Sequence, residues 1–320
     1  MRPALILGAT GSFGGGVARE MLARGHPVRL LVRDPAKASA RFATHEHAET
    51  VTGDAQDAAA LRRAAAGCGV IVHGVNYPYD QWRPHMVTAT ANVVAAAREA
   101  GATILFPGNV YGLGRQTSAP LPETAPMTPC SRKGRLRVDL ENMLRQAADD
   151  GARTLVVRAG DYFGPTVRNG LVDPIFKSAL AKRRMTVFGN LEAPHQWAYG
   201  PDLARCAVDV LALEGRLAPF AVVHFAGHVV PRQRDFLAVV AREAGAPGIP
   251  VRRMPWAAMR LIGLFSPVVR ELMELRYLFD EAVILDDPAR RALLPDFRPT
   301  PLSEAVRHTL GSYRAGQLTP

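Results

Sequence analysis

A glycine-rich turn between an apolar run and a helical pattern places the strongest constraint on this fold. The segment LILGATGSFGGGVAREML has glycines in the spacing G-x-x-G-x-x-G, directly between an expected strand and an expected helix. Such glycines permit a tight turn, a close approach of the backbone to a pyrophosphate, and packing of the helix on the strand. Free N–H groups at the helix N-terminus then attract phosphates. The predicted cofactor contacts here are Gly8, Thr10, Gly11, Ser12, Phe13 and Gly14.

The first half of the chain alternates apolar runs with helix-like stretches. The runs PVRLLVR, GVIVHGV and TILFPGN are separated by helical patterns such as MVTATANVVAAAREAG. This alternation predicts a parallel sheet with helices on both faces. We therefore expect an α/β fold: a Rossmann-type, doubly wound parallel sheet over residues 1–164, completed by about 196–229, with a smaller, mostly helical cap from 165–195 and 230–320.

The end of the second expected strand, LLVRDP, bears on the choice between NADP and NAD. A free ribose 2′-hydroxyl is usually held by an acidic residue at this strand tip. The tip falls on Val32 and is followed by Arg33, whose planar guanidinium suits a 2′-phosphate, with Lys37 adding charge. NADP is therefore favoured, although Asp34 leaves NAD as the alternative.

Two aspartates follow the third expected strand, in TGDAQD. Asp54 stands where a carboxylate could accept from the adenine amino group, or could simply belong to the turn. Asp57 precedes a helical pattern and is predicted to be its N-cap.

Composition argues against several partners. The chain has 320 residues and a net charge of +10, but its basic residues form no run of five and are not interleaved with aromatic residues, so we expect no nucleic-acid partner. The apolar stretch WAAMRLIGLFSPVV contains an Arg and a Pro and falls short of the roughly 20 residues that span a bilayer. The three cysteines have no metal or redox spacing and no leader peptide is evident. We expect a cytoplasmic protein without a metal, with a small-molecule substrate and possible homodimer formation.

Five segments, in this order, resemble the extended short-chain dehydrogenase/reductase superfamily, in its NAD(P)-dependent epimerase/dehydratase branch. They are GATGSFG, TGDAQD, VYG at 110–112, RAGDYFGP at 158–165 and WAYGPDLARC at 197–206. The first is specific for cofactor binding, and the others gain weight from their order. The resemblance covers roughly residues 1–230.

The resemblance implies a Ser/Thr cluster before VYG and a Tyr-x-x-x-Lys pair on the next helix. Here the Ser/Thr position falls on Pro107 or Gly108, and the helix in PCSRKGRLRVDLENML contains no Tyr. If Lys133 fills the Lys position, the Tyr position is Pro129; if Arg137 fills it, the Tyr position is Lys133. Neither register supplies a phenol, so we expect an atypical member without the usual triad.

Other residues could replace the triad. Tyr111 and Asn109 follow a parallel strand, where ligands of such sheets bind, and are a candidate proton donor and carbonyl polariser. The competing interpretation is that Tyr111 only packs. Lys133 could hold ribose hydroxyls or be a solvated charge at the helix start.

Two groups of residues are candidates for substrate contacts, with packing as the competing interpretation. They are Asn76, Tyr77, Tyr79 and Trp82 in HGVNYPYDQW, and Asp161, His195 and Trp197 further along the chain. Together these features predict an NAD(P)-dependent oxidoreductase for a small organic carbonyl or alcohol. A non-catalytic NADP-binding sensor and a nucleotide-sugar epimerase or dehydratase remain alternatives.

Overall fold

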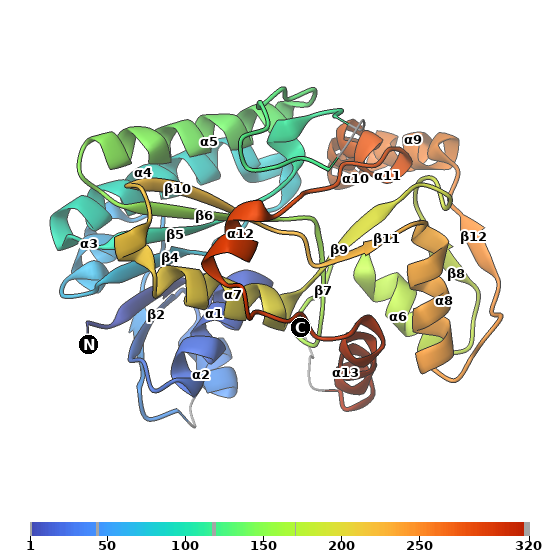
Figure 1. Cartoon of the computed structure of the whole chain (residues 1–320), viewed down its shortest axis with the longest axis horizontal. Coiled ribbons are helices and arrows are strands. Elements are labelled where there is room, and N and C mark those ends of the chain that lie inside the picture. Colours follow the sequence, from blue (N-terminus) through green and yellow to red (C-terminus); the bar gives the residue numbers. More distant parts are fainter. Residues whose placement is uncertain (1, 43–44, 117–119, 170, 317–320) are drawn as a thin grey trace.

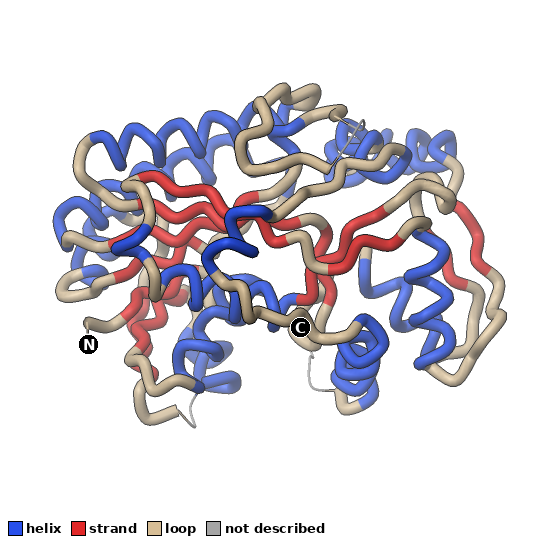
Figure 2. Tube along the Cα trace, in the orientation of Figure 1, coloured by secondary structure: helices blue, strands red, loops and turns tan. Residues whose placement is uncertain are grey.

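The computed structural model describes residues 2–42, 45–116, 120–169 and 171–316. Its centre is a seven-stranded sheet with the order β10-β6-β5-β4-β1-β2-β3, in which every neighbouring pair is parallel (Figures 1 and 2). The strands are β1 (Ala4–Leu7), β2 (Val28–Val32), β3 (Ala48–Thr52), β4 (Val70–His73), β5 (Thr103–Gly108), β6 (Thr154–Ala159) and β10 (Phe220–Phe225).

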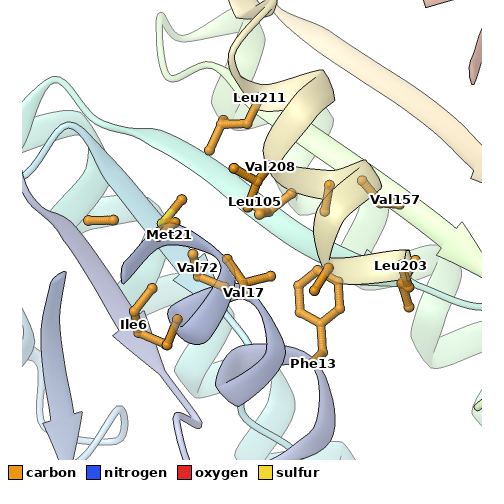
Figure 3. Packing of buried hydrophobic residues seen from close by; sticks show 14 of the residues in the cluster. Ile6, Phe13, Val17, Met21, Val72, Leu105, Val157, Leu203, Val208 and Leu211 are labelled. Carbon is orange, nitrogen blue, oxygen red and sulfur yellow. The ribbon is translucent and has the colours of Figure 1, made fainter. Parts of the chain in front are cut away.

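Helices cover both faces of this sheet. One face carries α1 (Ser12–Ala23), α2 (Pro35–Phe42) and α7 (Gly200–Leu211), and the other carries α3 (Ala58–Ala65), α4 (Trp82–Ala100) and α5 (Arg132–Asp149). Figure 3 shows Val17 of α1 and Val208 of α7 packed over Val72 and Leu105 of the sheet. The predicted Rossmann-type fold is confirmed.

The rest of the chain builds a second, smaller core. A three-stranded sheet joins β7 (Asp161–Phe163), β9 (His195–Tyr199) and β11 (His228–Val230), and β8 (Met185–Val187) pairs with β12 (Val251–Arg253). The helices here are α6 (Val172–Leu180), α8 (Gln233–Glu243), α9 (Trp256–Phe265), α10 (Pro267–Leu272), α11 (Tyr277–Asp280), α12 (Pro288–Leu293) and α13 (Leu302–Arg314). Short 3-10 helices are η1 (Tyr79–Gln81), η2 (Tyr111–Leu113), η3 (Glu214–Arg216) and η4 (Met273–Leu275).

Part of the C-terminal region returns to the main sheet. Phe297 lies edge-on to Phe225 of β10, with ring centroids 6.1 Å apart. The backbone N–H of Thr300 donates to Asp202, a buried residue in the first turn of α7. The segment after α11 therefore ties the smaller core back to the Rossmann sheet.

One local prediction about a helix start is confirmed. The carboxylate of Asp57 accepts from the N–H groups of Ala59 and Ala60 and so caps α3. Pro201 lies in the first turn of α7. Among the helices of the described residues, none is both long and apolar enough to cross a bilayer.

Candidate cofactor and active site

The turn after β1 has the close backbone contacts that its glycines predict. Gly8 has a φ of 71°, and a Cβ there would lie 2.3 Å from the carbonyl oxygen of Gly74. A Cβ at Gly14 would lie 2.6 Å from the carbonyl oxygen of Gly8. The Gly11 N–H donates to the same oxygen at 2.8 Å. Backbone atoms on both sides leave no space for side chains here.

The N-terminus of α1 is open to an anion. Gly11 stands at the N-cap without a side-chain cap, and the first turn holds no acidic residue. Uncapped N–H groups and the helix dipole favour a negative ligand here. Thr10 and Gly11 are exposed and Ser12 is half-buried, whereas the ring of Phe13 is in the core, so Phe13 offers a ligand only its backbone.

The tip of β2 is followed by two exposed basic side chains. The strand ends at Val32, and Arg33 and Lys37 are exposed beyond it. Asp34, the residue that argued for NAD, accepts from the N–H groups of Ala36 and Lys37 at 3.1 and 3.4 Å. Its carboxylate therefore serves the start of α2.

Two further arginines lie beside the phosphate loop, and sequence reasoning did not identify them. Arg41, near the end of α2, donates to the carbonyl oxygen of Thr10 at 2.5 Å. Arg19 lies over the ring of Phe42, and burial, followed by the positive charge of Arg41, lowers its pKa to about 10. Among the described residues, neither guanidinium has a carboxylate partner. Two unneutralised cations next to an uncapped helix favour an anionic ligand.

Asp54 and Tyr77 lie together on the β3 side of the site. The carboxylate of Asp54 accepts from the N–H of Gln56 at 3.0 Å, as the turn interpretation expected. The amide of Gln56 donates to the hydroxyl of Tyr77 at 2.7 Å, and the Tyr77 ring stacks on His85 at 5.0 Å. Tyr77 thus contacts the turn that follows β3.

Trp82 is a core residue that orients the loop above it. It is 3% exposed, and its indole N–H donates to the Asn76 side chain at 3.0 Å and to the Tyr77 carbonyl at 2.8 Å. For Trp82 the packing interpretation holds rather than the substrate contact, because its large apolar ring lies beneath that loop in the core with α4.

Tyr79 and Tyr111 form a hydroxyl pair beyond the carboxyl end of β5. Their oxygens are 2.9 Å apart, and both residues retain some exposed surface. The Asn109 side chain accepts from the Tyr111 N–H at 3.0 Å, so its amide oxygen holds the turn. Trp82 stacks against the Tyr111 ring with centroids 6.1 Å apart. The structure thus brings together the two phenols that sequence reasoning placed in separate groups.

Burial keeps these phenols protonated. It raises the pKa of Tyr111 well above its ordinary value, and the nearby Tyr79 and Asp161 add to the effect. Burial also raises the pKa of Tyr79. It raises the pKa of Tyr162, in β7, to about 12. The Arg137 guanidinium opposes these shifts without reversing them. A protonated phenol donates a hydrogen bond and is a poor base.

Lys133 is held by two glutamates. It is 3% exposed, and its ammonium bonds to Glu271 of α10 and, at 3.0 Å, to Glu274 of η4. It also lies 5.2 Å from the centroid of the Tyr79 ring. Of the two alternatives for Lys133, the solvated charge is wrong, because the residue is buried and carboxylates from the smaller core neutralise it. Both glutamates are far from Lys133 in sequence, and no local pattern indicated them.

Arg137 lies one turn further along α5, beneath the end of β5. It is buried, donates to the Pro107 carbonyl at 3.2 Å, and lies 5.0 Å from the centroid of the Trp82 ring and 5.4 Å from that of Phe106. Its Nε has no hydrogen-bond partner among the described residues.

The adjacent strand explains the glycine at the end of β5. Gly108 pairs with Arg158 of β6, and a Cβ at Gly108 would lie 2.3 Å from the Arg158 Cγ. Arg158 is buried, ion-paired with Glu141 and hydrogen-bonded to His224 at 3.2 Å. Burial, followed by the Arg158 charge, lowers the pKa of His224 to about 4. A Ser or Thr at Gly108 would collide with this network.

The second group of predicted substrate residues separates into a pair at a small cavity and a core residue. His195 Nε2 lies 2.9 Å from a carboxylate oxygen of Asp161. Both line a cavity of about 20 Å³ that also touches Val110, Pro194, Leu278 and Glu281. Trp197 is fully buried and stacks on Phe236 at 4.2 Å. Trp197 was a candidate substrate contact, but it has no exposed face because the smaller core surrounds it.

A family model described as NAD(P)H-binding matches residues 8–133. Residues 8–133 are thus similar to an NAD(P)H-binding domain. It is 23% identical over 251 residues to the uncharacterized protein y4nG of Sinorhizobium fredii, a match that covers 76% of this chain. The match spans 61% of the length of that relative.

Solved structures show the same fold over nearly the whole chain. A dTDP-glucose 4,6-dehydratase (DesIV double mutant) of Streptomyces venezuelae has a TM-score of 0.80 at 20% identity, covering 99% of this chain and 98% of its own. The enzyme WbmH of Bordetella bronchiseptica, in complex with NAD+, has a TM-score of 0.77 at 17% identity. The match covers 99% of this chain and 100% of WbmH. The UDP-N-acetylglucosamine 4-epimerase of Bacillus cereus has a TM-score of 0.79 at 15% identity. The match covers 100% of this chain and 99% of the epimerase. These likenesses show that the chain shares its fold with these three proteins.

Proposed function

We propose that this protein is an NADP-dependent oxidoreductase that reduces a small organic carbonyl. The observation that carries the proposal is the protonated hydroxyl pair of Tyr79 and Tyr111, 2.9 Å apart at the carboxyl edge of the NAD(P)-binding sheet. Ligands of open parallel sheets bind along this edge. The pair is therefore available to a carbonyl oxygen next to a cofactor bound at the phosphate loop.

The reaction divides between cofactor and protein. The reduced nicotinamide, when bound, supplies a hydride to the carbonyl carbon. The hydroxyl of Tyr111 or Tyr79 donates a hydrogen bond to the carbonyl oxygen and releases its proton to the alkoxide that forms. An alkoxide is a far stronger base than a phenolate, so this transfer is downhill even though the phenol pKa is raised. Solvent then restores the proton.

The same protonation states favour reduction over oxidation. Alcohol oxidation needs a base to accept the hydroxyl proton, and burial opposes the phenolate forms of both tyrosines. Glu271 and Glu274 neutralise Lys133, which reduces the support that its charge gives to a nearby phenolate. Because the resting phenols are in the acid form, we propose a carbonyl compound as substrate and the reduced cofactor as co-substrate.

The surroundings of the phosphate loop support NADP as that cofactor. Arg33 is exposed at the tip of β2, and Arg41 reaches the Thr10 carbonyl from α2. Asp34 is occupied at the start of α2. A 2′-phosphate placed between the guanidiniums would gain charge-assisted hydrogen bonds that a 2′-hydroxyl cannot make.

Turnover of NADPH with a panel of aldehydes and ketones tests the proposal. Tyr111→Phe should reduce turnover on the order of 100-fold, the usual scale for a general acid, while NADPH affinity is kept. Tyr79→Phe should also lower turnover, because either hydroxyl of the pair can be the donor and Tyr79 then no longer supports Tyr111. Tyr313→Phe is the matched control, since that hydroxyl bonds Asp173 in the smaller core. A fully active Tyr79→Phe/Tyr111→Phe double variant would remove the pair from the mechanism.

A second candidate function is a non-catalytic NADP-binding sensor. The observation that favours the sensor is that Lys133 is ion-paired with Glu271 and Glu274, which link it to the smaller core. Such a link could couple cofactor binding to the position of α10. Calorimetry with NADPH separates the two candidates: binding without turnover of any carbonyl supports the sensor.

The solved structures motivate a third candidate, a nucleotide-sugar epimerase or dehydratase. Two of the neighbours are named as a dTDP-glucose 4,6-dehydratase and a UDP-N-acetylglucosamine 4-epimerase. That chemistry begins by oxidising a sugar hydroxyl, which the protonated phenols here oppose. Incubation with UDP- and dTDP-sugars and NAD+ or NADP+ tests it directly, and any sugar conversion would favour this candidate over carbonyl reduction.

A further inference from the structure

Exposed apolar side chains gather on the α9–α10 hairpin. Large apolar residues are exposed at seven of the described positions, and five of these lie between Leu261 and Val268. Phe265 is 90% exposed and Leu264 69%. The others in the group are Leu261, Ile262 and Val268. Exposed apolar residues scattered singly are ordinary, but a contiguous cluster marks an interaction surface.

The hairpin is fixed in place by its other face. Met259 and Gly263 of α9 are buried, and a Cβ at Gly263 would lie 3.5 Å from the Arg270 Cα of α10. The Trp256 indole donates to Asp280 at 3.1 Å. Figure 1 shows α9, α10 and α11 grouped at one end of the molecule. Because the inner face is packed, the outward cluster is a fixed feature of the fold.

The charges around this cluster are positive. Arg260 on α9 and Arg270 on α10 are exposed, and among the described residues neither has a carboxylate partner. Arg252 and Arg253 of β12, just before α9, are also exposed. The hairpin's acidic residue, Glu271, turns inward to Lys133 and Arg132. The outer surface therefore combines apolar side chains with unneutralised arginines.

We propose that the α9–α10 hairpin docks this protein on the surface of an anionic lipid bilayer, with its apolar side chains in the interface. A helix with Phe and Leu on one face and flanking arginines lies in the headgroup region, and anionic lipids attract the arginines. A second copy of the chain fits less well, because two such surfaces would bring arginines together. The inner face of the hairpin holds Lys133 near Tyr79, so docking places the candidate site close to the membrane.

Vesicle sedimentation of the full chain tests this proposal. The protein should bind phosphatidylcholine vesicles that contain phosphatidylglycerol, bind pure phosphatidylcholine more weakly, and dissociate as salt is raised. Leu264→Ser/Phe265→Ser should reduce binding tenfold or more. Arg260→Glu/Arg270→Glu should reduce binding to the anionic vesicles alone. Val229→Ser is the matched control, because Val229 is 50% exposed on β11, outside the hairpin.

Several results would overturn the proposal. One is a wild-type protein that stays in the supernatant with anionic vesicles. Another is serine variants that bind as well as wild type while their thermal unfolding is unchanged. A concentration-dependent dimer in light scattering that the Phe265→Ser change abolishes would assign the surface to a second copy. Binding of the full chain to an acidic protein through this hairpin, without binding to vesicles, would assign the surface to a protein partner. NADPH binding in the same samples reports separately on the proposed function.

Discussion

The phosphate loop and the end of β5 lie along the same edge of one sheet, but they are built in opposite ways. At the loop, α1 begins without a side-chain cap or an acidic residue, so its positive potential is left for a ligand. At β5, the protein's own charges fill the site: Arg158 covers Gly108, and Glu271 and Glu274 neutralise Lys133. The first region depends on backbone geometry, and the second depends on side chains that come from distant parts of the chain.

The largest expected effect comes from removing one partner of the buried ion pair next to β5. Glu141→Ala leaves the buried Arg158 without its counter-charge, and the free energy of unfolding should fall by about 3–5 kcal/mol. Urea unfolding measures it. The double variant Glu141→Leu/Arg158→Met should recover most of the loss. Asp150→Ala is the control, since its pair with Arg98 is exposed and should contribute less than about 1 kcal/mol. Equal effects of Glu141→Ala and Asp150→Ala would contradict the buried network.

The next largest effect is expected from a substitution in the phosphate loop. Gly14→Ala places a Cβ 2.6 Å from the Gly8 oxygen and 2.7 Å from the Leu7 oxygen, so the backbone that we expect to approach a pyrophosphate must move. NADPH affinity should fall on the order of 100-fold, the scale of losing two charge-assisted hydrogen bonds. Isothermal titration calorimetry measures it, with Gly311→Ala as the control because no atom lies near a Cβ there. Wild-type affinity in Gly14→Ala would show that the cofactor binds elsewhere.

A smaller effect sharpens the cofactor assignment at the loop. Arg33→Ala and Arg41→Ala should each weaken NADPH by roughly 1–3 kcal/mol and leave NADH nearly unchanged, because only NADPH carries the 2′-phosphate. Arg63→Ala, on the exposed side of α3, is the control. Equal affinities of the wild-type protein for NADPH and NADH would sink the NADP assignment. A loss in Arg33→Ala but not in Arg41→Ala would confine recognition to the strand tip.

The sequence predicted the loop better than the β5 end, and the reason is physical. Gly8, Gly11 and Gly14 act through spacing within one turn, so their roles follow from the order of residues. Lys133 and Gly108 are decided by Glu274 and Arg158, whose positions depend on how helices and strands pack. The sequence excluded a phenol on α5, but only the structure joins Tyr79 to Tyr111.

The arginines near the phosphate loop also differ in how far the sequence could predict them. Arg33 was predicted because it follows a strand tip, whereas Arg41 reaches Thr10 only because α2 folds back beside the loop. The apolar stretch around Leu264 was recognised as too short to span a bilayer. That its apolar residues face outward, and Met259 inward, could not be deduced without the packing partners of α9.

The smallest expected effect concerns the contact between Lys133 and the smaller core, and it appears as a pH dependence. Burial opposes the charge of Glu274, but its bonds and attraction to Lys133 outweigh this and hold the Glu274 pKa below its ordinary value of 4.5. A carboxylate with a lowered folded pKa stabilises the protein above its unfolded pKa and loses that contribution as pH falls through the folded pKa. Stability should therefore decline below about pH 4.5 more steeply in the wild type than in Glu274→Gln. Thermal unfolding across this range measures the difference, and Glu304→Gln, on the exposed side of α13, is the control. Parallel curves for wild type and Glu274→Gln would show that Glu271 alone holds Lys133.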